Sequence, residues 1–158
     1  MESVTHTTEV VRELTIAARP ETVWEFLVDE EKARRWMGIE AKLEPQPGGL
    51  YRVEIVPDTV ARGTFLEVDP PRRLVFTWGW EPRPDGETYD VEPGQSTIEI
   101  TLEPDGDGTH LRFEHRDLPS GESAARHGHG WDHFLPRLAE AATGRDPGRD
   151  PWLDGAMT

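Results

Sequence analysis

Hydrophobic and polar residues alternate through much of the first 118 residues of the chain, a pattern typical of strands with one buried and one solvent-exposed face. The alternation predicts a first strand over Glu9–Ala17. Turn-forming residues at 45–49 and 105–108 separate several later strands. These are predicted, in chain order, over Ile39–Leu43, Leu50–Val56, Val60–Val68, Arg73–Trp80, Ser96–Pro104 and His110–Leu118.

Three segments have helical patterns instead. Pro20 suits a first helical turn, and the apolar residues that follow it predict one helix. A second short helix is predicted over Asp29–Trp36, and a long C-terminal helix over Glu122–Thr143, where Gly144 follows and ends it.

The order of elements predicts an α+β fold. An antiparallel sheet with one apolar face needs a cover, and the last helix is the only predicted element long enough to supply it. We therefore expect a curved antiparallel sheet around a long C-terminal helix. Residues 9–144 are expected to form this domain, with a flexible tail at 1–8, an extended tail at 145–158 and a long loop at 82–96.

Composition excludes several classes of function. The formal charge of -14 disfavours nucleic acid and anionic membranes as partners. The chain has no cysteine, so disulfides, thiolate metal sites and cysteine nucleophiles are excluded. The N-terminus does not resemble a secretory signal, and no segment is apolar over the length of a membrane span, so a cytoplasmic protein is expected.

The segment RHGHGWDHFLPRL, residues 126–138, contains three histidines. On a helix, His127 lies on the apolar face of Trp131, whereas His129 and His133 point to the other side. A metal site at His129 and His133 would need a third converging ligand, so we interpret them as part of a solvated polar face and expect no metal. Gly128 and Gly130 weaken this helix, which indicates a close approach to the sheet or to a ligand.

Motifs for common chemistries are missing. There is no GxSxG, GxGxxG or GxxxxGK[ST] pattern, so nucleophilic hydrolysis, dinucleotide binding and P-loop phosphate binding have no support, and no cofactor is expected. General acid–base catalysis stays open. His115 is the best candidate because it is in phase with the inward residues of its strand, and His127 and Tyr51 are further candidates.

Five stretches together resemble the family named for homology to the activator of the heat-shock-protein ATPase, within the START-like, birch-pollen-allergen-like superfamily (SRPBCC) that includes polyketide cyclases. The stretches are RPETVWEFLVD (Arg19–Asp29), PGGLYRVEI (Pro47–Ile55), EVDPPRRLVFTWGW (Glu67–Trp80), TIEITLEPDGDGTHLRFEHRDLP (Thr97–Pro119) and HGHGWDHFLPRLAEAATG (His127–Gly144). Their order and spacing make the resemblance specific.

This resemblance implies a helix-grip fold with a hydrophobic cavity between the sheet and the C-terminal helix, and often a homodimer. Three functions remain open: binding of a small apolar or aromatic molecule, cofactor-independent acid–base catalysis of the cyclase or isomerase type, and a chaperone-related interaction. We favour binding, with residues 82–96 and 20–36 framing the mouth. The candidate ligand-binding residues are Trp36, Tyr51, Phe65, Phe76, Trp78, Trp80, Phe113, His115, His127, Trp131 and Leu135.

Overall fold

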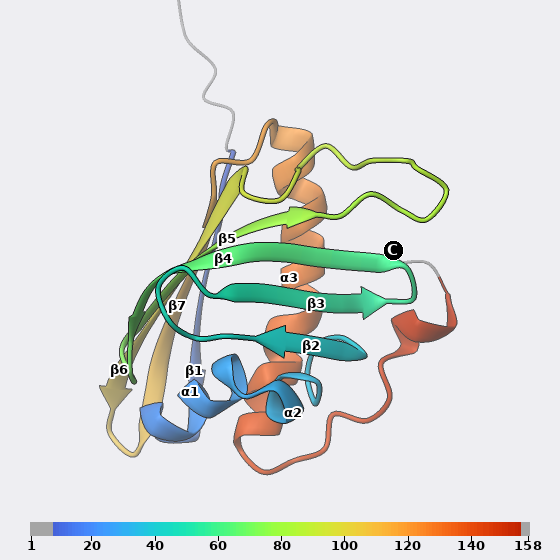
Figure 1. The fold of residues 1–158 in the computed structure, drawn as a ribbon. Helices are drawn as coiled ribbons and strands as arrows, with labels where there is room; N and C mark the ends of the chain where they lie inside the picture. The colour runs from blue at the N-terminus through green and yellow to red at the C-terminus, as the bar shows by residue number, and fades with distance from the viewer. Residues whose placement is uncertain (1–7, 156–158) are drawn as a thin grey trace, which may run out of the picture.

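The computed structural model describes residues 8–155, which form one sheet and one long helix with shorter helical segments around them (Figure 1). The strands are β1 (Val10–Ile16), β2 (Glu40–Leu43), β3 (Leu50–Val56), β4 (Thr59–Asp69), β5 (Arg73–Trp80), β6 (Ser96–Asp105) and β7 (Gly108–Arg116). The helices are α1 (Pro20–Val28), α2 (Glu30–Ala33), α3 (Gly121–Ala142) and the 3-10 turn η1 (Pro151–Asp154). The expected N-terminal tail, residues 1–8, lies outside the described residues apart from Thr8.

The seven strands form one antiparallel sheet in the order β1-β7-β6-β5-β4-β3-β2. The alternation in the sequence becomes an alternation of burial, most regularly in β3 and β7. Pairing shifts register in β3 between Glu54 and Val56, and in β4 between Phe65 and Glu67. Such bulges bend strands, which lets the sheet curve around α3 (Figure 1).

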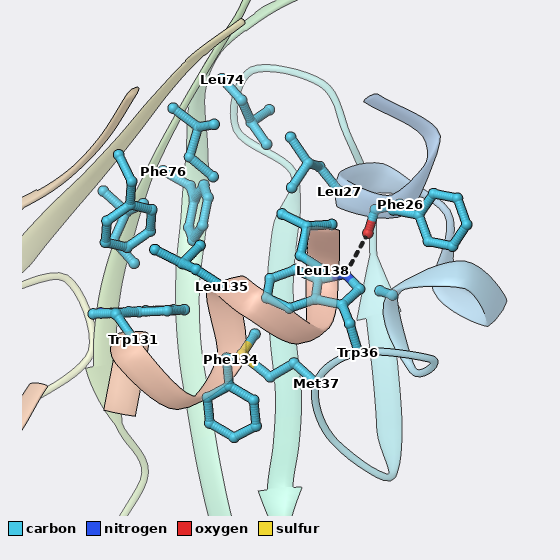
Figure 2. Close-up of a cluster of buried hydrophobic side chains, with 14 of the residues drawn as sticks. Phe26, Leu27, Trp36, Met37, Leu74, Phe76, Trp131, Phe134, Leu135 and Leu138 are labelled. Carbon is cyan, nitrogen blue, oxygen red and sulfur yellow. Dashed lines mark hydrogen bonds between the residues drawn. The ribbon is translucent and has the colours of Figure 1, made fainter. Parts of the chain in front are cut away.

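The core lies between the concave face of the sheet and one face of α3. Figure 2 shows Trp131, Leu135 and Leu138 on the side of this helix that faces Phe76 of the sheet, with Trp36 next to Leu138. Leu138 is completely buried. This arrangement confirms the expected α+β helix-grip fold.

Polar contacts fix α3 relative to its neighbours. Arg12 of β1 forms a salt bridge with Asp132 at 2.6 Å. A Cβ atom at Gly128 would lie 3.0 Å from the Arg12 guanidinium and 3.7 Å from Val10, so at this glycine the helix approaches β1 closely. In the second half of the helix, Arg137 donates to the Trp36 carbonyl at 3.1 Å. The helix is therefore anchored at its middle to β1 and in its second half to the chain after α2.

Two details differ from the expected elements. The helix predicted over Asp29–Trp36 is only α2, which Asp29 caps by accepting a hydrogen bond from the Lys32 amide at 3.0 Å. The segment after α3 contains η1, whereas no regular element was expected there. Among residues 8–155, no helix combines the length and apolar character needed to cross a membrane.

Candidate functional site

A pocket of about 420 Å³ lies at one end of the core, where α3, the loop of residues 81–95 and the C-terminal segment of residues 145–155 come together. Figure 1 shows this loop and this segment on the same side of the sheet. Six aromatic side chains line the pocket: Trp78, Trp80, Tyr89, Trp131, Phe134 and Trp152. Its polar lining comes from Thr59, Asp90, Arg126, His127 and His129.

The end of β5 places two tryptophans side by side at this pocket. Trp78 and Trp80 are two residues apart on a strand and so face the same side, with their rings 5.3 Å apart in a T-shaped arrangement. Gly79 lies between them, and a Cβ atom there would be only 1.9 Å from the Glu92 carbonyl. The Trp80 amide also donates to the Val91 carbonyl at 2.8 Å. The glycine thus lets the loop return against β5 beside the pocket.

His127 is held by two hydrogen bonds at the pocket wall. Its Nδ1–H donates to the Ser123 carbonyl at 2.8 Å, and its Nε2 accepts from Trp80 Nε1–H at 3.1 Å. This pattern requires the neutral ring with the proton on Nδ1. Burial lowers the pKa of His127 despite the opposing effects of the Ser123 carbonyl and Asp90.

His115 belongs to a second, fully buried chain of hydrogen bonds. Trp131 Nε1–H donates to His115 Nδ1 at 3.1 Å, which leaves the ring proton on Nε2 to donate to Ser96 Oγ at 2.8 Å. The Ser96 hydroxyl then donates to the Trp78 carbonyl at 2.6 Å. Burial, together with the nearby His127, holds the pKa of His115 well below its ordinary value.

Both histidines are therefore neutral and have both ring nitrogens occupied. A proton transfer by either ring would first have to break one of these hydrogen bonds, and His115 does not line the pocket. The geometry favours a structural role that orients Trp80 and Trp131. Among residues 8–155 there is no group of three or more histidine, aspartate or glutamate side chains placed to hold a metal ion.

Comparison with known proteins identifies the family. A sequence model described as Activator of Hsp90 ATPase homolog 1-like protein matches residues 17–143. The chain belongs to this AHSA1 family. The AHSA1-like protein RHE_CH02687 of Rhizobium etli is 49% identical over 91% of this chain and 87% of its own, with a TM-score of 0.71. No match was found among curated proteins.

Two further solved structures are similar to the AHSA1 chain at lower sequence identity. CalU16 from Micromonospora echinospora is 26% identical over 85% of this chain and 76% of its own, with a TM-score of 0.66. PFC0360w, an HSP90 activator from Plasmodium falciparum, is 19% identical over 87% of this chain and 97% of its own, with a TM-score of 0.69. At 19% identity, the likeness to PFC0360w concerns the fold alone.

The C-terminal segment of the AHSA1 chain contributes Trp152 to the pocket, and this side chain packs against the two histidines expected to face solvent. His133 Nε2 and the Trp152 amide both bond to Asp150 Oδ1, at 2.8 and 2.9 Å. The rings of His133 and Trp152 stack at 3.8 Å, and His129 lies 5.5 Å from the same indole. The solvated-face interpretation was therefore wrong for His133, whose side chain is only 18% exposed because the segment covers it.

The structure separates the eleven predicted ligand-binding residues into two groups. Trp78, Trp80, His127 and Trp131 line the pocket. The other seven lie in the buried core away from the pocket wall: Trp36, Tyr51, Phe65, Phe76, Phe113, His115 and Leu135. They pack against one another because the curved sheet lies directly on α3; Tyr51 and Phe76, for example, stack at 4.2 Å. Contact of any of the eleven with a ligand stays a prediction.

Sequence reasoning missed several residues of the pocket wall, including Tyr89, Asp90, Phe134 and Trp152. For two of them the signal was present: an aromatic residue in a segment rich in proline, glycine and charge needs an apolar partner. Tyr89 meets Trp80 at 5.6 Å, and Trp152 meets Phe134 at 5.5 Å. Which apolar residue each of the two contacts depends on how distant parts of the chain pack together, so the sequence pattern does not identify it.

Stability should fall on mild acidification because of the two neutral histidines. Below the ordinary histidine pKa of 6.5, the unfolded chain takes up protons that His115 and His127 bind less readily in the folded chain, because burial lowers the pKa of both. The free energy of unfolding should therefore decrease between pH 6.5 and 5.5, by up to about 1.4 kcal/mol per pH unit for each histidine. Urea unfolding at pH 7.5, 6.5 and 5.5 checks this. A constant free energy over that range would contradict it.

Proposed function

We propose that this protein binds one small, flat, largely aromatic molecule in the pocket lined by Trp78, Trp80, Tyr89, Trp131, Phe134 and Trp152, without turning it over. The observation that carries the proposal is the convergence of six aromatic side chains from β5, α3, the loop of residues 81–95 and η1 on a single hollow. A pocket of about 420 Å³ is within the usual range for small-molecule sites, which are mainly apolar with a few polar groups.

The hydrogen bonds of the tryptophan N–H groups indicate that the expected ligand carries an acceptor oxygen. Those of Trp36, Trp80 and Trp131 have acceptors within the protein. Trp78 Nε1 is buried and lacks a hydrogen-bond partner among residues 8–155. A buried donor without an acceptor costs about 1–3 kcal/mol. An aromatic ligand with a carbonyl or hydroxyl oxygen would supply the missing acceptor, provided that small side-chain shifts let this oxygen reach Nε1.

Catalysis has weaker support than binding. The two candidate acid–base groups, His115 and His127, are neutral and fully hydrogen bonded, so neither presents a free lone pair to a bound molecule. A chaperone partner is supported only by the family and by the shared fold of an HSP90 activator. Formation of a homodimer and a cytoplasmic location also stay predictions.

Gly130 offers a way to block the pocket without removing any contact. It lines the pocket, and a Cβ atom there would meet no other atom within 4 Å. Gly130→Leu should fill part of the hollow and weaken ligand binding at least about tenfold, a change of roughly 1.4 kcal/mol. Intrinsic tryptophan fluorescence with a panel of flavonoids, anthraquinones and fatty acids provides the measurement, and thermal melting provides a second readout.

Gly130→Ala is the matched control. Both variants replace a helical glycine and should stabilise α3 by about 0.5–1 kcal/mol, but alanine fills little of the pocket. Ligand affinity should be kept in Gly130→Ala and lost in Gly130→Leu. Equal affinity in both variants would place the ligand elsewhere, and no saturable response to the whole panel from the folded wild-type protein would overturn the proposal.

A further inference from the structure

A second hollow, of about 700 Å³, lies next to the aromatic pocket, and Met37 lines both. Its walls are the chain after α2, the last turns of α3 and residues 144–150 with Leu153. Five arginines line this arginine hollow: Arg34, Arg35, Arg137, Arg145 and Arg149. Nothing in the proposed binding of an aromatic molecule uses them.

The concentration of positive charge is unusual for this chain. Its 17 lysines and arginines are outnumbered by 31 acidic residues, yet five of the 17 line one hollow with only two aspartates, Asp146 and Asp150. Both aspartates serve local structure. Asp146 accepts from the Gly148 amide at 2.8 Å, and Asp150 bonds to His133 and to the Trp152 amide. The hollow therefore has a net positive lining within an acidic protein.

The arginines differ in how far they are engaged. Arg34 and Arg145 are exposed, and among residues 8–155 neither forms an ion pair or a side-chain hydrogen bond. Arg35 approaches Glu31 only at 3.9 Å, and Arg149 pairs with the exposed Asp154 at 2.9 Å. Two guanidinium groups are thus free to take an external partner, and two more are held only by surface pairs, which contribute little.

Arg137 gives this hollow a fixed cationic wall. Its guanidinium is half-buried and donates to three backbone carbonyls: Trp36 at 3.1 Å, Pro147 at 3.3 Å and Gly148 at 2.8 Å. These contacts orient the side chain without neutralising its charge, because no carboxylate takes part. A guanidinium held in this way keeps its attraction for an anion and also ties the C-terminal segment to the chain after α2.

We propose that the arginine hollow binds a small phosphate-bearing anion through Arg34 and Arg145. Guanidinium groups pair with phosphate oxygens through two parallel hydrogen bonds, and Arg34 and Arg145 line the same hollow without a carboxylate partner among residues 8–155. The net charge of -14 repels a nucleic-acid backbone or an anionic membrane, so the local positive charge suits a ligand small enough to enter the hollow. The proposal is independent of the aromatic ligand.

Pyrophosphate is the probe that tests it. Titration of the folded protein, followed by calorimetry and by amide chemical shifts, should give saturable binding with a Kd at or below about 1 mM at low salt. Shifts should appear at residues 34–38 and 144–150. Affinity should fall as salt is added, because exposed charges are screened. Sodium chloride at equal ionic strength serves to measure any general salt effect.

Paired variants make the result decisive. Arg34→Gln with Arg145→Gln should weaken pyrophosphate binding at least about tenfold, equivalent to roughly 1.4 kcal/mol. Arg19→Gln with Arg112→Gln removes the same charge from exposed or half-exposed positions outside the hollow and should leave affinity unchanged. Equal losses in both pairs, equal binding in all proteins or no saturable binding by the wild-type protein would each overturn the proposal. All of these residues lie on the surface, so each variant should fold.

Discussion

Replacement of Trp131 by alanine is expected to lower the free energy of unfolding by about 3–5 kcal/mol, the range for truncation of a buried aromatic residue. Trp131 is 4% exposed and packs against Phe113 at 4.6 Å and Trp78 at 5.1 Å. It also donates the hydrogen bond that fixes the tautomer of His115. The variant therefore leaves both a cavity and an unpaired buried acceptor. Urea unfolding followed by circular dichroism measures the loss.

Trp131→Phe separates the two causes. Phenylalanine keeps most of the buried ring but cannot donate to His115, so this variant should lose only about 1–3 kcal/mol, the cost of a buried polar group without a partner. If the phenylalanine variant were as unstable as the alanine variant, the hydrogen bond would dominate over packing. If Trp131→Ala cost less than about 1 kcal/mol, the side chain would not be part of the core as the structure has it.

His115→Leu should be the second most costly change, with a loss of about 2–3 kcal/mol at pH 7.5. Leucine is similar in volume and suits the apolar surroundings, but it removes the acceptor for Trp131 Nε1–H and the donor to Ser96. Ser96 keeps its bond to the Trp78 carbonyl, so the unpaired indole donor is the main cost. Urea unfolding at pH 7.5 checks the magnitude.

The same variant makes a second prediction about pH. Because residue 115 then takes up no proton on unfolding, the decrease in stability between pH 6.5 and 5.5 should be at most about half that of the wild-type protein, since burial lowers the pKa of His115 more than that of His127. His110→Leu is the matched control, since His110 lies on the same strand but is only partly buried and pairs only with Glu13 among residues 8–155. The control should change stability at pH 7.5 by less than about 0.5 kcal/mol. A similar loss in both variants would contradict the role given to the buried hydrogen-bond chain.

The sequence predicted the fold well because local patterns determine it. Alternation located every strand to within two residues, and the Asp105–Gly108 turn and Gly144 defined the β6–β7 hairpin and the end of α3. His127 was correctly placed on the buried face of α3 because it lies four residues before Trp131. These features depend on neighbours close in the chain, which is why a single sequence contained them.

The pocket was harder to predict because it depends on contacts distant in the chain. Whether an inward aromatic residue such as Phe65 or Trp78 lines a cavity is decided by the curvature of the sheet, which arises from register shifts in β3 and β4. Likewise, no local pattern pairs His133 with Asp150, 17 residues later. The aromatic character of the site was visible in the sequence, but the division between core and pocket was not.

The C-terminal segment of residues 145–155 contributes Trp152 to the aromatic pocket and Asp150 and Leu153 to the arginine hollow. One short stretch of backbone thus belongs to two neighbouring hollows and forms a partition between them. If a molecule in one hollow shifts the position of this partition, thermodynamic linkage requires that the affinity of the other hollow changes, and that the effect is equal in both directions. A communication of this kind needs no motion of the sheet or of α3.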